Sequence, residues 1–212
     1  MSVLNLGLIG CGSAINWMYG PYFRFLKRGR LAAVMDVDPD RARSVGERYG
    51  VPAYTDLDAM LHQAPIEAVI VATPTNLHCE AAVAAARASK HVYCEKPMAP
   101  TIEQADAIIQ ACQQAKVKLM IAFMKRFNKS FQRAHEIVAS GEIGEVFELR
   151  CVWDNARAAA STANYRHRAE SGGGYMQEDG SHPLDICRWW LGEVQEVTGH
   201  AMICLLYTSD AA

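Results

Sequence analysis

The sequence predicts an α/β protein, with a doubly wound parallel sheet followed by the start of a second, smaller domain. Short apolar runs recur through the first 123 residues, and a helix-like segment follows each of them. The first run ends in Gly10-Cys11-Gly12, a tight turn between a buried strand and a helix. After Arg126 the pattern changes to alternation with a period of two. We therefore predict one domain over residues 1–123 and the beginning of another over 124–203.

The predicted strands of the first domain are its apolar runs, at 3–9, 31–35, 68–72, 91–94 and 119–123. A helix is expected from about Ala14, with a break near Gly20-Pro21, and further helices at 40–49 and 76–89. The helix from Thr101 has the clearest signal, because Thr101 and Gln104 fit a capping box at its start. A strand-and-helix alternation of this kind is typical of a parallel sheet covered on both faces.

The second domain is predicted to start with a helix over 131–140 and a half-buried strand over 146–153. A run of three glycines at 172–174 precedes a helix over 181–191, which Gly192 ends. One more strand is expected over 194–203. The last residues, 204–212, differ in character and resemble translated adapter sequence, so we interpret them as a non-native tail. The alternative is a natural strand end with a short tail.

Composition and charge exclude several classes of protein. The 212 residues carry 21 Lys and Arg against 23 Asp and Glu, a net charge of −2. That balance offers no field for nucleic acid or an anionic membrane, and no apolar stretch is long enough to span a bilayer. The seven cysteines form no Cys-x-x-Cys pair and the N-terminus lacks a signal-peptide pattern, so we expect a cytoplasmic protein. Its partners should be small molecules or copies of itself.

The turn after the first strand indicates a dinucleotide site. Glycines at 10 and 12 let backbone N–H groups and a helix N-terminus approach a pyrophosphate. The third position of the fingerprint is Ile15 rather than Gly or Ala. Asp36 ends the next predicted strand, where a carboxylate can accept from ribose hydroxyls and repel a 2′-phosphate. NAD is therefore favoured over NADP, the alternative being a plain glycine turn beside a capping Asp36.

Two further segments end strands on the same edge of the sheet. The first, Ala72 to His78, follows strand 68–72; its alternative interpretation is a plain turn capped by Asn76. The second is Glu95-Lys96-Pro97, where the proline restricts Lys96 to extended geometry. A lysine there can stabilise the alkoxide that develops as a hydride leaves. We assign the following residues to the cofactor: Gly10, Gly12, Ser13, Ala14, Ile15, Asp36, Thr73, Pro74, Asn76, His78, Glu95 and Lys96.

A histidine near the glycine run completes the candidate chemistry. His182 can take a hydroxyl proton near neutral pH, and Glu178 or Asp185 could orient its ring. The alternative is a helix-start histidine that makes only capping contacts. The histidines and cysteines show no metal-ligand spacing, so no metal is expected.

Taken together, these motifs resemble the glucose–fructose oxidoreductase, inositol dehydrogenase and rhizopine-catabolism family, known as Gfo/Idh/MocA. The resemblance covers residues 3–203 and rests on the order and spacing of the glycine turn, Ala72-Thr73-Pro74, Glu95-Lys96-Pro97, Arg126-Phe127-Asn128, Tyr165-Arg166, Gly172-Gly173-Gly174, Gly180-x-His182, Asp185 and Trp190-Leu191-Gly192.

The resemblance implies a Rossmann domain and an α+β domain with an open, mostly antiparallel sheet, here incomplete, that mediates oligomerisation. It implies a cis bond between Lys96 and Pro97. It also implies that Lys96 and His182 are catalytic, with Glu178 standing where many members have aspartate. Further candidates for contact with substrate are Arg126, Asn155, Tyr165, Arg166 and Asp185.

We expect an NAD(P)-dependent oxidoreductase that transfers a hydride between nicotinamide and a sugar, cyclitol or related polyol. Two alternatives stay open: an NAD-dependent glycosidase of the same family, and a non-catalytic dinucleotide-binding regulator. A regulator has no need of the proton relay that Lys96 and His182 would provide.

Overall fold

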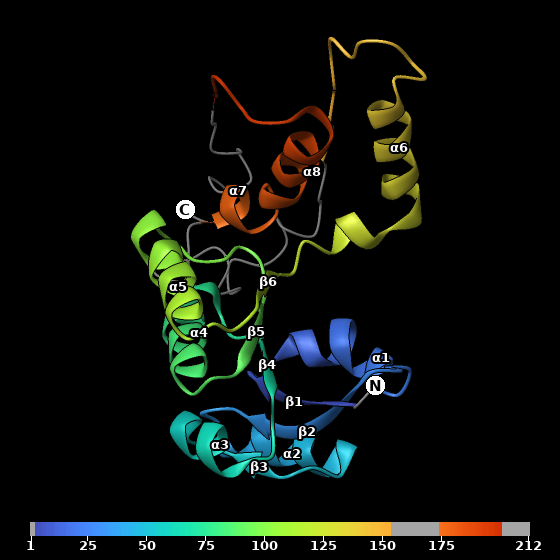
Figure 1. The fold of residues 1–212 in the computed structure, drawn as a ribbon. Helices are drawn as coiled ribbons and strands as arrows, with labels where there is room; N and C mark the ends of the chain where they lie inside the picture. The colour runs from blue at the N-terminus through green and yellow to red at the C-terminus, as the bar shows by residue number, and fades with distance from the viewer. Residues whose placement is uncertain (1–2, 154–173, 201–212) are drawn as a thin grey trace, which may run out of the picture.

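The computed structural model describes residues 3–153 and 174–200, and its centre is a six-stranded sheet (Figure 1). The strands are β1 (Leu4–Ile9), β2 (Gly29–Met35), β3 (Ala53–Tyr54), β4 (Ala68–Val71), β5 (His91–Cys94) and β6 (Leu119–Ile121). They lie in the order β3-β2-β1-β4-β5-β6, and every neighbouring pair is parallel. This is the strand order of a doubly wound dinucleotide-binding fold, as predicted.

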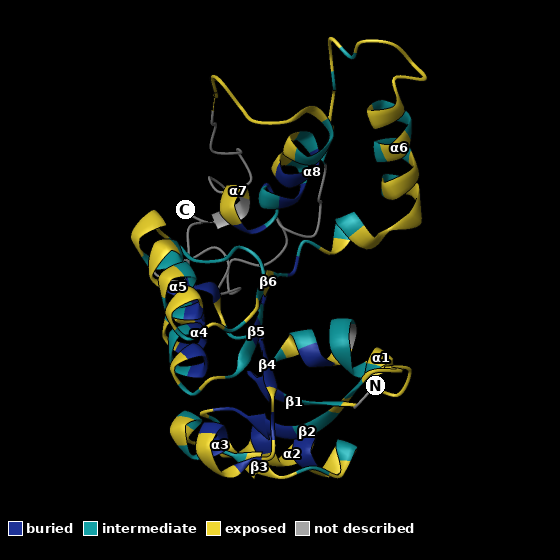
Figure 2. Ribbon diagram, in the orientation of Figure 1, coloured by how far each residue is buried: buried dark blue, intermediate teal, exposed yellow. Residues whose placement is uncertain are grey.

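Successive residues of the central strands face opposite layers of helices. Ile9 and Val71 pack in a core with α3 (Leu57–Gln63), α4 (His78–Arg87) and α5 (Ile102–Gln114). Leu8 and Ile70 pack on the other face with η1 (Ile15–Tyr19), α1 (Gly20–Phe23) and α2 (Pro39–Tyr49). Figure 2 shows β4 and the last residues of β1 and β2 as buried. Burial on both faces explains why these strands are continuously apolar in the sequence.

Local signals place the helix ends. Asp38 accepts from the backbone N–H groups of residues 40 and 41 at the start of α2, and Gly50 ends that helix with a positive φ. Thr101 accepts from the backbone of Gln104, as the predicted capping box requires. The other half of the box does not form, because Gln104 Oε1 has no hydrogen-bond partner in the described part of the chain. The break expected near Gly20-Pro21 is not an interruption: residues 13–23 are continuously helical, and Gly20 marks the change from the π-helix η1 to α1.

Two elements of the first domain were not predicted. Strand β3 has only two residues, too few to show any periodicity. Helix α3 follows its N-cap Asp56, whose carboxylate accepts from the N–H of Ala59, so the capping signal was present in the sequence.

All the regular elements that the structure describes in the second half of the chain are helices. It contains η3 (Met124–Phe127), α6 (Lys129–Ser140), α7 (Gly174–Glu178) and α8 (Ser181–Leu191). Helices α6 and α8 meet through aromatic pairs: Phe131 with Trp190, centroids 6.0 Å apart, and His135 stacked on Trp189 at 4.4 Å. Gly192 ends α8 with a positive φ, as predicted.

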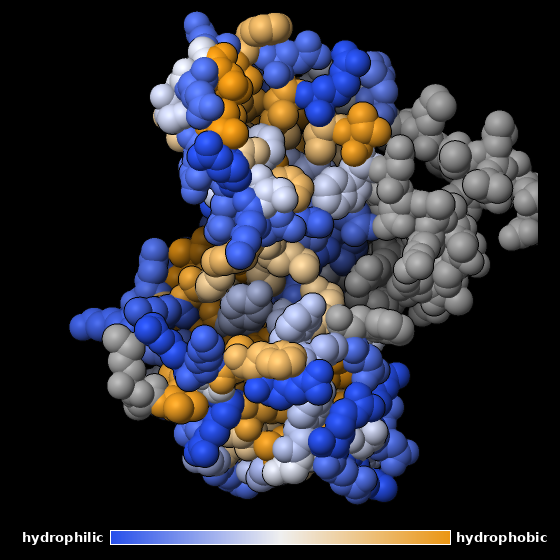
Figure 3. All heavy atoms as spheres, turned by 90° about the vertical axis from the view of Figure 1, so that its right-hand side faces the viewer, coloured by the Kyte–Doolittle hydropathy of each residue, from blue (hydrophilic) through white to orange (hydrophobic). Residues whose placement is uncertain are grey.

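The strand predicted over 146–153 is not formed, and neither is the described part of the one predicted over 194–203. Both segments run through solvent, and Phe147 is 96% exposed. A strand needs a hydrogen-bonded neighbour and a surface on which to bury its apolar face. Among the residues that the structure describes, neither is present for these two segments. Figure 3 shows apolar side chains on the surface of the part that carries α6.

In the two described ranges, no helix is both long enough and apolar enough to cross a membrane. The six cysteines in those ranges are free thiols.

Candidate active site

The candidate site lies along one edge of the sheet, where the parallel strands end. The register pairs Ile9 of β1 with Met35 and Val71, and Val71 with Cys94. The segments that leave β1, β2, β4 and β5 therefore emerge side by side. This juxtaposition is what the sequence predicted for the glycine turn, Asp36, the Thr73 segment and the Lys96 segment.

The glycine turn can accept a dinucleotide. Gly10 has φ +97°, and a Cβ there would lie 2.8 Å from the main-chain carbon and oxygen of Ala72. Only glycine lets these two turns pack so closely. A Cβ on Gly12 would meet no atom within 4 Å, so the space above this residue is open. Open space over a glycine at a helix start suits the pyrophosphate of NAD.

Asp36 braces that turn from the end of β2. One carboxylate oxygen accepts from Cys11 N at 2.7 Å, and the other accepts from Asp38 N at 2.9 Å. A carboxylate has about four acceptor positions, so two remain for ribose hydroxyls. Burial and the Asp36 charge raise the pKa of the Cys11 thiol to about 12. Cys11 is therefore a protonated packing residue at neutral pH.

Ile15 was predicted to contact the cofactor, and the structure places it elsewhere. It is fully buried in the core beneath the turn. Ser13 and Ala14 occupy the first helical positions after Gly12 and are exposed and partly exposed, respectively. Ile15 opens η1, a stretch of π-helix whose wider turn makes room for a side chain larger than the usual Gly or Ala.

His78 was also predicted to contact the cofactor, and this prediction is wrong. The side chain is 1% exposed. Nδ1 lies 2.9 Å from the Pro97 carbonyl oxygen and Nε2 lies 3.0 Å from the Thr73 carbonyl oxygen. Both ring nitrogens are thus occupied by the protein's own backbone. Pro74 and Asn76, by contrast, are exposed on the same segment.

The Glu95-Lys96-Pro97 segment has the cis bond between Lys96 and Pro97 that the resemblance implied. The Lys96 ammonium donates to the main-chain oxygen of Glu178. The Glu95 carboxylate accepts from the Tyr19 hydroxyl and from Lys96 N. Burial, then the Glu95 charge, raise the pKa of Tyr19 well above its ordinary value, so this phenol remains a donor.

His182 lies in the first turn of α8 and is 8% exposed. Its ring centroid is 6.1 Å from that of Trp153, and its Nδ1 has no hydrogen-bond partner among the residues that the structure places. Burial, together with the charges of Lys96 and Lys125, lowers the pKa of His182 to about 4, against the opposing charges of Asp179 and Asp185. The imidazole is therefore neutral at pH 7 and able to accept a proton.

The carboxylates expected to orient His182 have other partners. Glu178 Oε1 accepts from the Thr75 hydroxyl at 2.6 Å. Asp185 receives two-pronged hydrogen bonds from Arg126, at 2.6 to 3.2 Å. The glutamate side chain is one methylene longer than the aspartate of many relatives, and it extends to Thr75. Arg126 and Asp185 join η3 to α8, and their predicted contact with substrate stays a prediction.

Three residues of the site were not predicted. Thr75 was missed although it lies inside the Thr73 segment, because a hydroxyl in a turn has no distinctive pattern. Lys125 was missed beside Arg126; its ammonium lies 5.3 Å from the Trp153 ring centroid. Tyr19 was missed because its partner Glu95 is 76 residues away. The candidates Asn155, Tyr165 and Arg166 lie outside the described residues.

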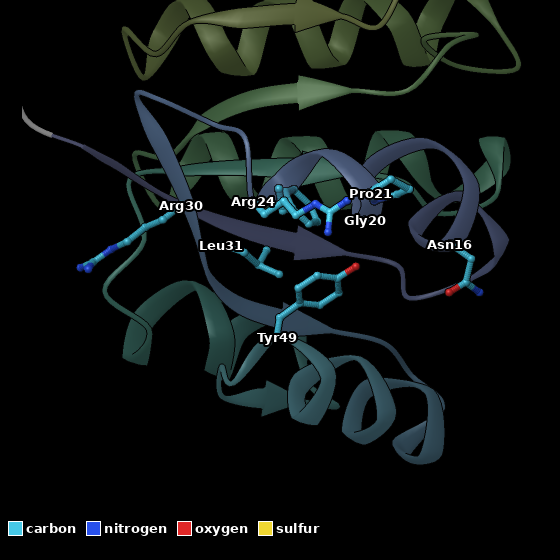
Figure 4. Close-up of a pocket in the computed structure, with 8 residues that line it drawn as sticks. Asn16, Gly20, Pro21, Arg24, Arg30, Leu31 and Tyr49 are labelled. Carbon is cyan, nitrogen blue, oxygen red and sulfur yellow. The ribbon is translucent and has the colours of Figure 1, made fainter.

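A cavity of about 490 Å³ lies away from these residues, beside η1 and the end of α2 (Figure 4). Tyr49 points into it and Arg30 extends outward. Its lining includes none of the residues assigned above to cofactor or chemistry. Within 3–153 and 174–200, no three His, Cys, Asp or Glu side chains gather as metal ligands would.

Comparison with known proteins identifies the relatives of this chain. Residues 4–123 match the family described as "Oxidoreductase family, NAD-binding Rossmann fold", and residues 131–205 match the "GFO/IDH/MocA C-terminal domain". The chain is 32% identical to the myo-inositol 2-dehydrogenase of Thermotoga maritima over 92% of its own length and 57% of that protein. It is 30% identical to the 2,7-anhydro-N-acetylneuraminate hydratase of Escherichia coli, over 92% of this chain and 51% of that protein.

Among solved structures, the scyllo-inositol dehydrogenase of Lactobacillus casei with bound NAD(H) and scyllo-inositol superposes with a TM-score of 0.78. The identity is 26%, over 90% of this chain and 57% of that one. The chain thus spans little more than half the length of these relatives. The predicted NAD cofactor agrees with the glycine turn, the sheet order, the NAD-binding family match and the similarity to an NAD(H)-bound structure. The chain belongs to the Gfo/Idh/MocA family of NAD-binding oxidoreductases.

Proposed function

We propose that the protein containing this chain is an NAD-dependent dehydrogenase or reductase of a sugar, cyclitol or related polyol. The observation that carries the proposal is that Lys96, at the strand edge that also bears the glycine turn, binds the main chain just before the helix of His182. The Lys96 ammonium donates to the main chain of Glu178, four residues before His182, and its charge acts on the imidazole. The sequence separates the two residues by the whole of α5, β6 and α6.

The two side chains suit opposite tasks at one reacting oxygen. An ammonium has three N–H donors, so Lys96 can donate to a substrate oxygen as well as to Glu178. Such a donor stabilises negative charge that develops on that oxygen. His182 is neutral and can take the hydroxyl proton. NAD, when bound, supplies the acceptor for the hydride that leaves the carbinol carbon. Oxidation then yields a ketone, NADH and a proton held on His182.

The remaining assignments follow from the same arrangement. Residues 1–123 would bind NAD, with Gly10, Gly12, Ser13, Ala14 and Asp36 nearest to it. Residues 124–203 would begin a domain that binds substrate and joins copies of the protein into a homo-oligomer. The free thiols suit a reducing compartment, so we place the protein in the cytoplasm.

The experiment uses the full-length protein with NAD or NADP and a panel of inositols, aldoses and nucleotide sugars, followed by absorbance of the reduced nicotinamide. Turnover should be found with at least one polyol. Lys96→Met and His182→Ala should each lower kcat by about 10² or more with NADH affinity nearly unchanged. Lys118→Met, a change to an exposed lysine, is the control. Wild-type rates in either site variant would remove that residue from the mechanism.

The similarity to a hydratase favours a second candidate, in which oxidation is transient and the net reaction is addition or elimination. Product analysis separates the two. A dehydrogenase forms NADH in step with product, whereas the alternative forms product from catalytic NAD without net reduction.

A further inference from the structure

We propose that His78 is a positioning residue that ties the Lys96 turn to the Thr75 turn and so sets where the Lys96 ammonium lies. The inference rests on the proposed function for its kinetic consequences only. The contacts that suggest it form a closed ring of hydrogen bonds, here called the circuit, through three segments: 73–78, 95–97 and Glu178.

The first part of the circuit is the His78 ring. It opens α4, at the end of the segment that leaves β4. Nδ1 lies 2.9 Å from the Pro97 oxygen, and Nε2 lies 3.0 Å from the Thr73 oxygen. Carbonyl oxygens only accept, so a ring N–H must donate wherever one of these bonds forms, and the tautomer decides which nitrogen carries it. With 1% exposure, water cannot replace either bond.

The second part runs from the Lys96 turn to Glu178. Pro97, whose oxygen faces His78, is the immediate neighbour of Lys96. The Lys96 ammonium donates to the main-chain oxygen of Glu178. Movement of the Pro97 carbonyl would therefore move the base of the lysine side chain.

The third part returns to the starting segment. Glu178 Oε1 accepts from Thr75 Oγ1 at 2.6 Å, and both side chains are nearly fully buried. Thr75 lies three residues before His78 in the short helix η2 (Thr75–Leu77). The segment 73–78 thus makes two contacts. His78 contacts the turn that carries Lys96, and Thr75 binds Glu178, whose main-chain oxygen accepts from Lys96. Removing the histidine therefore removes one of the constraints on Lys96.

The test compares three variants of His78 in the full-length protein. His78→Phe keeps a ring and removes both ring nitrogens. His78→Asn keeps an amide nitrogen near the position of Nδ1, facing Pro97, and His78→Gln keeps one near Nε2, facing Thr73. Because the Pro97 bond holds the lysine turn, kcat should fall about 10-fold to 100-fold in the Phe variant. Asn should recover more of it than Gln, and the Kd for NADH should change by less than about threefold.

The control is Ile108→Val, which trims a fully buried side chain of α5, the helix packed on α4, without touching either turn. It should lower thermal stability and leave kcat unchanged. A similar fall in kcat in this control would assign the His78 effect to general destabilisation and overturn the proposal. Equal recovery by Asn and Gln would also overturn it.

Amide hydrogen exchange tests the same idea without turnover. Peptides that cover residues 94–98 should exchange faster in His78→Phe and in His78→Gln than in His78→Asn or the control. If no polyol is turned over but exchange follows this order, the proposed function fails and the positioning role stands. If exchange at 94–98 is the same in all variants, the positioning role is wrong whatever the activity.

Discussion

The Thr75 hydroxyl and the Glu178 carboxylate are joined by a hydrogen bond of 2.6 Å, across 103 residues of sequence. Thr75 belongs to the NAD-binding half of the chain, and Glu178 belongs to the half that carries His182. The bond therefore holds together the two parts of the candidate site. It also explains how a glutamate is accommodated at this position: its extra length is used to reach Thr75.

Thr75→Val should destabilise the protein, because it removes a donor from a buried carboxylate. We expect a loss of about 1–3 kcal/mol in the free energy of unfolding. Thr75→Ser keeps the hydroxyl and should recover most of it. A double-mutant cycle with Glu178→Gln, measured by urea denaturation, gives the coupling energy. Additive effects of the two changes would show that the bond does not form in solution.

Asp36→Ala should erode the preference for NADH over NADPH, since it removes both the charge that repels a 2′-phosphate and the bond to Cys11 N. Fluorescence titration with the two reduced nucleotides measures the preference. Asp56→Ala is the matched control, because Asp56 also accepts from a backbone N–H but caps the distant helix α3. Equal affinities for the two nucleotides in the unmodified protein would contradict the assignment of Asp36.

The value of kcat/KM for polyol oxidation should stay high as the pH is lowered well past 6.5. Burial with Lys96 and Lys125 holds the pKa of His182 at about 4, so the base stays unprotonated through that range. Lys125→Met removes a positive charge that disfavours the imidazolium. It should therefore move the acidic limb of the profile to higher pH, whereas Lys118→Met should not. An acidic limb at the ordinary histidine value in the unmodified protein would refute the environment described here.

The lowered pKa of His182 also predicts how this residue contributes to the pH dependence of stability. In the unfolded chain the ring takes up a proton near pH 6.5, whereas in the folded protein it does so only near pH 4. Between these values the unfolded state binds more protons, so stability falls as the pH is lowered through this window. His182→Gln should reduce that slope between pH 7 and 4.5, measured as the change in urea midpoint. An unchanged slope would show that His182 is solvated.

Arg126→Met should destabilise the protein by about 1–3 kcal/mol, because it leaves the buried Asp185 carboxylate without its partner. The guanidinium is 42% exposed, so solvent screening keeps the loss below that of a fully buried pair. Arg126→Lys should recover little, since an ammonium cannot make the two-pronged contact. The double variant Arg126→Met/Asp185→Asn should recover part of the lost free energy of unfolding. Denaturation with guanidinium chloride measures the stability of the unmodified protein and the three variants. Full rescue by Arg126→Lys would contradict the two-pronged contact with Asp185.

Much of the fold could be predicted from local patterns. Residues such as Leu8-Ile9 and Val69-Ile70-Val71 are apolar on both faces of their strands, and this property marks a covered parallel sheet whatever lies elsewhere. Thr101 and Gly192 mark helix ends through backbone hydrogen bonding and a positive φ. The strands expected over 146–153 and 194–203 show the limit of such reasoning. Alternation describes a side-chain pattern, whereas a ladder needs a neighbour that the described residues do not supply.

The sequence by itself determined which residue types stand at the ends of the strands: Gly10 and Gly12, Asp36, the Thr73 segment and Lys96. Since parallel strands end at one edge, their convergence followed as well. Only the tertiary structure decided their partners. Glu178 binds Thr75 rather than His182, and His78 binds two backbone carbonyls rather than a cofactor. A hydrogen bond depends on sub-ångström placement of atoms from distant segments, and no local pattern contains that information.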